Sequence, residues 1–131
     1  FSDNDEFLRR VRFQNHFKHD LVRWDAFKEK DAEMSWTYRG EALKEESGIF
    51  EYHAHFSECV GEPLPAILGF TFLGLIREVE PSLEPRHKPD RDDFKYGHLH
   101  CVTASPNRDQ MKSLAKLVND GIYARVLYRH P

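Results

Sequence analysis

The stretch that decides the predicted fold is residues 94–131, FKYGHLHCVTASPNRDQMKSLAKLVNDGIYARVLYRHP, which predicts a strand, a helix and a second strand. The first strand is expected over Lys95–Thr103. The helix is expected to begin where the Ser105 hydroxyl can accept an unpaired backbone N–H and where a proline follows. Gly121 is expected to end it, because glycine readily adopts the left-handed conformation of a helix C-terminus. The second strand is expected over Tyr123–Tyr128. The apolar residues of the helix form one stripe: Met111, Leu114, Ala115, Leu117 and Val118.

The size and composition indicate a single folded domain over residues 1–131. The chain is 40% apolar and 31% charged, which is typical of a globular protein. Its formal net charge of −3 argues against a dedicated nucleic-acid binder, which normally carries a concentrated basic face. Two cysteines, Cys59 and Cys101, predict buried thiols in a reducing compartment. The longest apolar stretch, Ala66–Ile76, is too short to span a membrane.

Residues 1–30 predict a helical N-terminal segment that is both aromatic and basic. Arginines, lysines and histidines lie between its apolar residues, so one face could contact an anionic partner. The alternative is a solvated helix face above a stripe of core residues. The apolar residues recur at steps of roughly three or four: Phe7, Val11, Phe13, Phe17, Leu21, Trp24 and Phe27.

The middle of the chain predicts an α/β fold with a mainly parallel sheet and flanking helices. Strands are expected over Met34–Arg39, Ile49–Ser57 and Gly69–Ile76, the last being the most apolar and therefore central. A brief helix is expected over Glu62–Leu68. Residues 78–93 carry three prolines among many charges and predict a long surface loop of the kind that often binds a partner.

A His-x-His pattern occurs twice, at His53 and His55 and at His98 and His100. If each pair lies on a strand, both of its histidines face the same side of the sheet. Two such strands side by side could present four imidazoles, enough for zinc or another divalent ion. The alternative is that these histidines are packed or partly exposed side chains without a metal.

The sequence His98-Leu99-His100 also resembles the histidine–hydrophobic–histidine motif of rolling-circle replication nucleases. That resemblance implies a bound metal ion and a tyrosine nucleophile, commonly on a helix. The helix expected after His100 contains no tyrosine, since Tyr123 and Tyr128 fall on the following strand. A nuclease or other histidine-based metal protein is therefore one of the functions that the sequence leaves open.

A second resemblance covers about one hundred residues, from Asp31 onward. It rests on the segments DAEMSWTYR at residues 31–39, FEY at residues 50–52 leading to ECVG at residues 58–61, and LAKLVNDG at residues 114–121. In this order they resemble the distal part of medium-chain dehydrogenase/reductases of the zinc-free quinone-oxidoreductase type, which include the mitochondrial reticulon-interacting proteins. The resemblance implies a partial Rossmann-like fold.

That family binds its cofactor pyrophosphate with a glycine-rich turn, and this sequence lacks the turn. The resemblance therefore implies a degenerate relative: a non-catalytic accessory subunit of a larger, mitochondrial complex, with no cofactor. Its protein partners are expected to bind the N-terminal segment and loop 78–93. The alternative is an enzyme fragment that needs a partner chain to bind NADPH, in which case Val60 and Gly61 would lie near the cofactor ribose.

Overall fold

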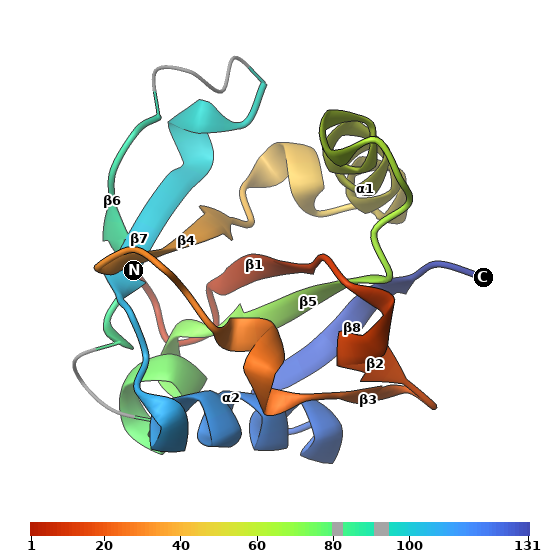
Figure 1. Cartoon of the computed structure of the whole chain (residues 1–131). Coiled ribbons are helices and arrows are strands. Elements are labelled where there is room, and N and C mark those ends of the chain that lie inside the picture. The colour runs from red at the N-terminus through yellow and green to blue at the C-terminus, as the bar shows by residue number, and fades with distance from the viewer. Residues whose placement is uncertain (80–82, 91–94) are drawn as a thin grey trace.

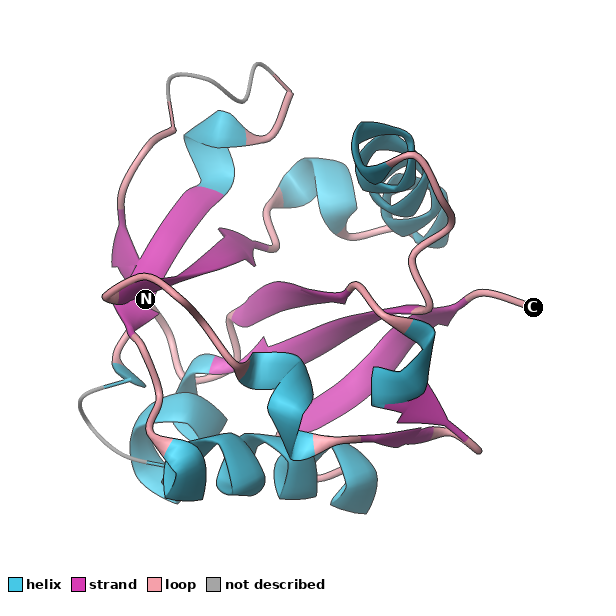
Figure 2. Ribbon diagram, viewed as in Figure 1, coloured by secondary structure: helices cyan, strands magenta, loops and turns pink. Residues whose placement is uncertain are grey.

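The computed structural model of the chain describes residues 1–79, 83–90 and 95–131. In this part of the chain, six strands form one sheet in the order β6-β7-β4-β1-β5-β8, and every neighbouring pair is antiparallel. A separate hairpin consists of β2 and β3 (Figures 1 and 2). The strands are β1 (Glu6–Val11), β2 (Phe17–Lys18), β3 (Leu21–Val22), β4 (Glu33–Tyr38), β5 (Ala66–Thr71), β6 (Arg86–His87), β7 (His100–Ala104) and β8 (Ala124–Arg129), and the α-helices are α1 (Glu46–Val60) and α2 (Arg108–Asp120).

The two α-helices lie on opposite faces of this sheet (Figure 1). Helix α1 joins β4 to β5, which are parallel to each other because both are antiparallel to β1 between them. Helix α2 joins β7 to β8 in the same direction across the sheet, but β7 runs opposite to β4. Two crossovers of the same hand must then cover opposite faces, as observed.

Each face of the sheet has its own apolar core. Phe7 and Leu8 are neighbours on β1 and point to opposite faces, and both are almost fully buried. Phe7 belongs to the core under α2, and Leu8 packs with Tyr52 and Ile67 in the core under α1. Burying such a side chain stabilises the fold by about 1.5–3 kcal/mol. Strand β1 is therefore apolar on both sides.

The predicted fold class is wrong, because the direction of the strands in the sheet differs from the prediction. Helices α1 and α2 each join two parallel strands, but only α2 was predicted as a helix. Those strands are not neighbours, however, because antiparallel strands lie between them, so the sheet is antiparallel instead of mainly parallel and Rossmann-like. The predicted helical N-terminal segment is also wrong. Residues 1–30 form β1, the β2–β3 hairpin and two short 3-10 turns.

Two elements in the middle of the chain also differ from their predictions. The strand expected over Ile49–Ser57 is part of α1, whose apolar side chains recur at helical spacing. The brief helix expected over Glu62–Leu68 is instead a turn that leads into β5. Strand β5 ends at Thr71, and a π-helical segment follows over Gly74–Val79.

Other local predictions are confirmed, except for the residue that caps the start of α2. Strand β4 covers the expected Met34–Arg39 region, and Gly121 ends α2 with φ of 70°. The cap at the start of α2 is Asn107 instead of Ser105: its side chain accepts from the Gln110 N–H at 2.9 Å, and the Gln110 side chain accepts from the Asn107 N–H. As expected, no helix within the described residues is long and apolar enough to cross a bilayer.

Candidate functional site

The two His-x-His pairs occupy different kinds of secondary structure. His53 and His55 lie in α1, where residues two apart point in directions about 200° apart. His100 is the first residue of β7, and His98 lies in the 3-10 turn Gly97–Leu99 just before it. The predicted four-imidazole site required both pairs to lie on strands. That requirement is not met, because His53 and His55 lie in a helix.

His53 is a structural residue of the α1 core. Its side chain is buried, and Nε2 donates to the Leu64 carbonyl oxygen at 2.8 Å. Its ring also packs on Tyr128, with 4.1 Å between ring centroids. The hydrogen bond from His53 to Leu64 connects α1 to the segment that leads into β5.

His100 is held by the neighbouring edge strand. Its Nδ1 lies 2.6 Å from the Lys88 carbonyl oxygen, and the Lys88 N–H donates to the His100 carbonyl oxygen at 3.0 Å. Lys88 is fixed in turn by Glu33 on β4, with 2.6 Å between Nζ and Oε1. The hydrogen bond from Lys88 lowers the pKa of Glu33. A ring nitrogen of His87, beside Lys88, donates to the His98 carbonyl oxygen at 2.7 Å.

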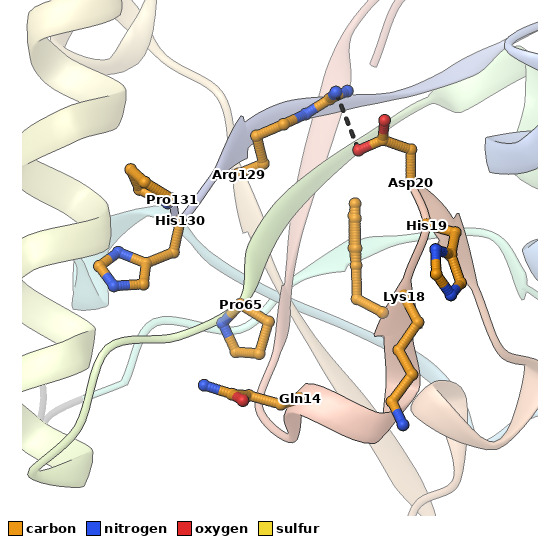
Figure 3. A pocket seen from close by; sticks show the side chains of 9 residues that line it. Gln14, Lys18, His19, Asp20, Pro65, Arg129, His130 and Pro131 are labelled. Atoms are coloured by element: carbon orange, nitrogen blue, oxygen red, sulfur yellow. Dashed lines mark ion pairs between the residues drawn. The ribbon is translucent and has the colours of Figure 1, made fainter.

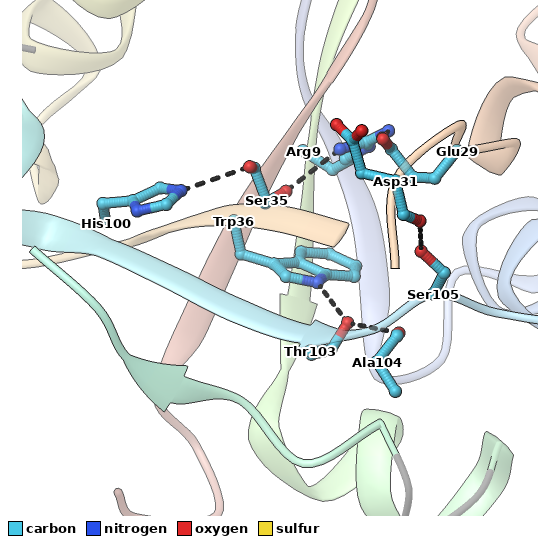
Figure 4. A network of polar contacts seen from close by, with 9 residues as sticks. All are labelled: Arg9, Glu29, Asp31, Ser35, Trp36, His100, Thr103, Ala104 and Ser105. Atoms are coloured by element: carbon cyan, nitrogen blue, oxygen red, sulfur yellow. Dashed lines mark hydrogen bonds and ion pairs between the residues drawn. The ribbon is translucent and has the colours of Figure 1, made fainter. Parts of the chain in front are cut away.

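This arrangement determines which nitrogen of His100 carries the proton. A carbonyl oxygen can only accept, so Nδ1 must be the donor to Lys88. In the neutral ring, Nε2 then has no proton and can accept a hydrogen bond or bind a metal ion. It lies 3.2 Å from the Ser35 hydroxyl (Figure 4). Histidines that bind metals are commonly oriented in this way, by a carbonyl that accepts from the other ring nitrogen.

His100 lines a small polar cavity of about 160 Å³ on the face of the sheet that α1 covers. Liquid water occupies about 30 Å³ per molecule, so this space suits a hydrated ion or a phosphate group and is too small for a dinucleotide. The lining residues come from β1, β4, α1, β7 and the segment before β7: Leu8, Arg10, Ser35, Trp36, Thr37, Phe56, Asp90, Tyr96 and His100.

Arg10 supplies the positive charge of this cavity. Its guanidinium lies 3.8 Å from the centre of the Phe56 ring, a cation–π contact that orients it. Tyr96 packs beside Phe56 with 5.8 Å between ring centroids and closes the wall. An arginine fixed in this way can hold an anion such as a phosphate, and the Asp90 carboxylate lines the same cavity.

The backbone of Ser35 links this cavity to the other face of the sheet. Its carbonyl oxygen accepts from Arg9 Nη1 at 3.0 Å, and Arg9 is paired with Glu29 (Figure 4). Burial lowers the pKa of Arg9, and the Glu29 carboxylate opposes that shift. The charged pair thus holds β4 in place behind the cavity.

The cavity does not by itself complete a metal site. Catalytic zinc sites use three protein ligands, and nowhere in residues 1–79, 83–90 and 95–131 do three or more histidine, cysteine or acidic side chains gather as a metal-binding group. His100 Nε2 has the right chemistry, but His98, two residues earlier, is exposed and does not line the cavity. Any further ligands would have to come from a substrate, from water or from outside the described residues.

Val60 and Gly61, the residues predicted to lie near a cofactor ribose, end α1. Gly61 adopts the left-handed conformation with φ of 89°, and its N–H donates to the carbonyl oxygen of Ser57 at 2.9 Å. The resemblance implies the end of a strand here, which is not what is observed. A helix C-terminus also carries partial negative charge, which disfavours a phosphate nearby. Binding of NADPH stays a prediction without support from this geometry.

Comparisons with protein-family models, with curated proteins and with solved structures found no match for the chain. The candidate site therefore rests on its own geometry. Sequence reasoning singled out His98 and His100 and named Arg10 among the basic residues that could contact an anionic partner, but it did not place Arg10, Ser35 and Phe56 beside His100. These three are brought to His100 by the pairing of β1, β4 and β7 and by the packing of α1, which no local sequence signal encodes.

Proposed function

We propose that this protein is a nuclease that acts on the phosphodiester backbone of a nucleic acid through the His98-Leu99-His100 motif. The observation that carries the proposal is the ring of His100, which the Lys88 carbonyl orients through Nδ1 and which lines a small cavity together with Arg10. The motif alone is a weak signal. The cavity adds a space for an anion and a histidine that can accept a proton or bind a metal ion.

The chemistry follows from these groups. Arg10 would bind the negatively charged phosphate, and His100 would either accept a proton or bind a divalent ion that polarises the phosphate. In hydrolysis, the oxygen of a water molecule forms a bond to phosphorus, the bond from phosphorus to a sugar oxygen breaks, and that sugar oxygen takes a proton. Magnesium often binds few protein ligands and completes its shell with water and substrate phosphates, which suits an open site.

The nucleases that share the motif use a tyrosine nucleophile. Helix α2 contains no tyrosine and lies on the face of the sheet opposite the cavity. Tyr96 lines the cavity together with His100. The experiment must therefore distinguish hydrolysis by water from a covalent adduct between a tyrosine and the nucleic acid.

The test is cleavage of end-labelled single- and double-stranded oligonucleotides with added magnesium or manganese. We expect cleavage that EDTA abolishes, and we expect His100→Ala to reduce the rate at least about hundredfold. Denaturing gels of the protein show whether label stays attached to it. His55→Ala is the matched control, because a ring nitrogen of His55 faces Cys59 Sγ at 3.8 Å. Cleavage that persists in His100→Ala, or no cleavage of any substrate, contradicts the proposal.

A non-catalytic subunit of a mitochondrial complex is the second candidate. The dehydrogenase-like sheet that motivated it is not observed, but one surface favours a protein partner. Phe50 on α1 is 58% exposed and lies beside β8, the last strand at its side of the described sheet. Free sheet edges and exposed aromatic residues are common in protein interfaces. If the natively purified protein is monomeric and has no partner, this candidate fails.

A further inference from the structure

A basic, aromatic arm projects from the end of β1. We call it the basic hairpin and define it as residues 12–25, which contain β2 and β3. Phe13 is 50% exposed and Leu21 is 55% exposed, and Arg12, Lys18 and Arg23 are also on the surface. The sequence predicts a helix over residues 1–30. Its basic residues were expected either to contact an anionic partner or to form a solvated face above a stripe of core residues. In the structure, the exposed Arg12, Lys18, His19 and Arg23 of that segment lie on this hairpin.

The hairpin is held in one position by contacts to the body of the protein. The side chain of Asn119 on α2 pairs with the backbone of Val22, accepting from its N–H at 2.9 Å and donating to its carbonyl oxygen at 3.1 Å. Asp20 at the hairpin tip pairs with Arg129 of β8 at 2.9 Å. His19 and Asp20 both have positive φ, as a tight two-residue turn requires. A preorganised arm loses little entropy when it binds a ligand.

The charge of this region is opposite to that of the chain as a whole. The whole chain has a net charge of −3, whereas the hairpin and the adjoining Arg129 carry two net positive charges. The charged residues that give this balance are Arg12, Lys18, Arg23 and Arg129 against Asp20 and Asp25, with His16 and His19 among them. Such a basic patch on an acidic protein is the electrostatic complement of a phosphate backbone.

Phe13 gives the patch an aromatic surface. Its ring contacts His16 edge-on at 5.5 Å, and the Arg12 guanidinium lies 5.3 Å from its centre. Half of the side chain is still open to solvent. An exposed aromatic ring among cations is the arrangement on which the bases of a single strand stack while the cations contact its phosphates. A paired duplex offers no such open base.

The hairpin is continuous with the candidate site. Arg10 lines the His100 cavity, and Arg12 follows two residues later, about 7 Å further along an extended chain. On its other side, the hairpin borders a second cavity of about 320 Å³ (Figure 3). Lys18 and His19 line that cavity from the hairpin, and Arg129 and Pro65 line it from the body of the protein.

We infer that the basic hairpin binds single-stranded nucleic acid, stacking a base on Phe13 and placing Arg12 and Lys18 against phosphates, so that the strand leads past Arg10 to the cavity that His100 lines. This inference rests on the proposed function, because it names the substrate as single-stranded and the surface that holds it. Binding and cleavage are carried by different residues and can be tested separately.

The test measures binding of a fluorescein-labelled oligothymidine of about twenty nucleotides by anisotropy, at several salt concentrations and with EDTA present. We expect Phe13→Ala to weaken binding roughly five- to hundredfold. We expect the double variant Arg12→Gln/Lys18→Gln to lower the slope of log K against log salt by about 1.4, since each phosphate contact contributes about 0.7 for single strands. A duplex of the same length should bind more weakly.

Two matched variants serve as controls. Phe50→Ala removes an aromatic side chain that is 58% exposed on α1, and Lys44→Gln removes an exposed charge near the end of β4, at the end of the sheet away from the hairpin. The inference is overturned if Phe13→Ala binds as the wild type does, if Phe50→Ala weakens binding as much, or if the duplex binds equally well. If binding is lost in the hairpin variants while no substrate is cleaved, the inference stands and the proposed nuclease fails. If a substrate is cleaved while the hairpin variants bind as the wild type does, the proposed nuclease is supported and the inference is overturned.

Discussion

The two His-x-His pairs have the same spacing in the sequence and opposite roles in the structure. In α1, His53 turns into the core and donates to the Leu64 carbonyl, while His55 points elsewhere on the helix. At the start of β7, the Lys88 carbonyl holds His100 so that its Nε2 faces a polar cavity. The backbone that carries each pair decides whether a ring nitrogen is used by the fold or remains able to react.

Each pair is followed by a cysteine, and the two thiols differ in their exposure to solvent. Both cysteines were predicted to be buried, which is wrong for Cys59: it is exposed near the end of α1, whereas Cys101 is buried in β7 next to His100. Burial raises the pKa of the Cys101 thiol to about 11. At pH 8 its thiolate fraction is then roughly two hundredfold below that of an ordinary thiol. We expect iodoacetamide to label Cys59 alone in the native protein and both cysteines in urea, as mass spectrometry of the peptides can show.

The raised pKa of Cys101 also gives stability a pH dependence. The folded thiol keeps its proton to a higher pH than the unfolded thiol does, so its contribution is complete below about pH 8.5 and is lost as the pH rises toward 11. Cys101→Ala should flatten this part of the stability profile, and Cys59→Ala should leave it unchanged. Equal labelling of the two native cysteines would contradict the burial of Cys101.

The next largest effect concerns His53. We expect His53→Ala to lower the free energy of unfolding by about 2–4 kcal/mol, because it leaves the Leu64 carbonyl without its donor and opens a void beside Tyr128. Urea unfolding followed by circular dichroism measures the change. His100→Ala is the comparison and should cost less than about 1 kcal/mol, because its ring is only half-buried and water can replace it at the Lys88 carbonyl. If His53→Ala and His100→Ala lowered the free energy of unfolding by similar amounts, the contrast between a structural and a reactive pair would be contradicted.

Local sequence signals predicted the last helix and the last strand of the chain. Helix α2 has one apolar stripe and a glycine that ends it, and β8 follows as an apolar strand. Helix α1 was missed because the alternation of His53 and His55 was taken for a strand. The apolar residues of α1 do recur at helical spacing, at Ile49, Tyr52, Phe56 and Val60.

The strand order could not be predicted, and neither could the candidate site as a whole. Strand β1 pairs with two strands that come later in the chain, β4 and β5, and this pairing makes the sheet antiparallel. His100 meets Lys88, twelve residues away, and Ser35, sixty-five residues away. Each of these contacts depends on which strands become neighbours, and the apolar pattern of a single strand is the same for several neighbours. The motif identified His98 and His100, and the sheet supplied their surroundings.

The smallest expected effect is that of His55→Ala. The His55 ring is partly exposed, contacts Phe56 at 4.8 Å and Tyr96 at 5.4 Å, and holds no backbone group. Alanine has a higher helix propensity than histidine and offsets part of the lost contact, so stability should change by no more than about 0.5 kcal/mol. Cleavage should also stay within about twofold of the wild-type rate, since the ring nitrogens do not line the cavity. If His55→Ala instead lowered cleavage as His100→Ala does without unfolding the protein, α1 would belong to the reactive site, and the division between a structural and a reactive pair would be wrong.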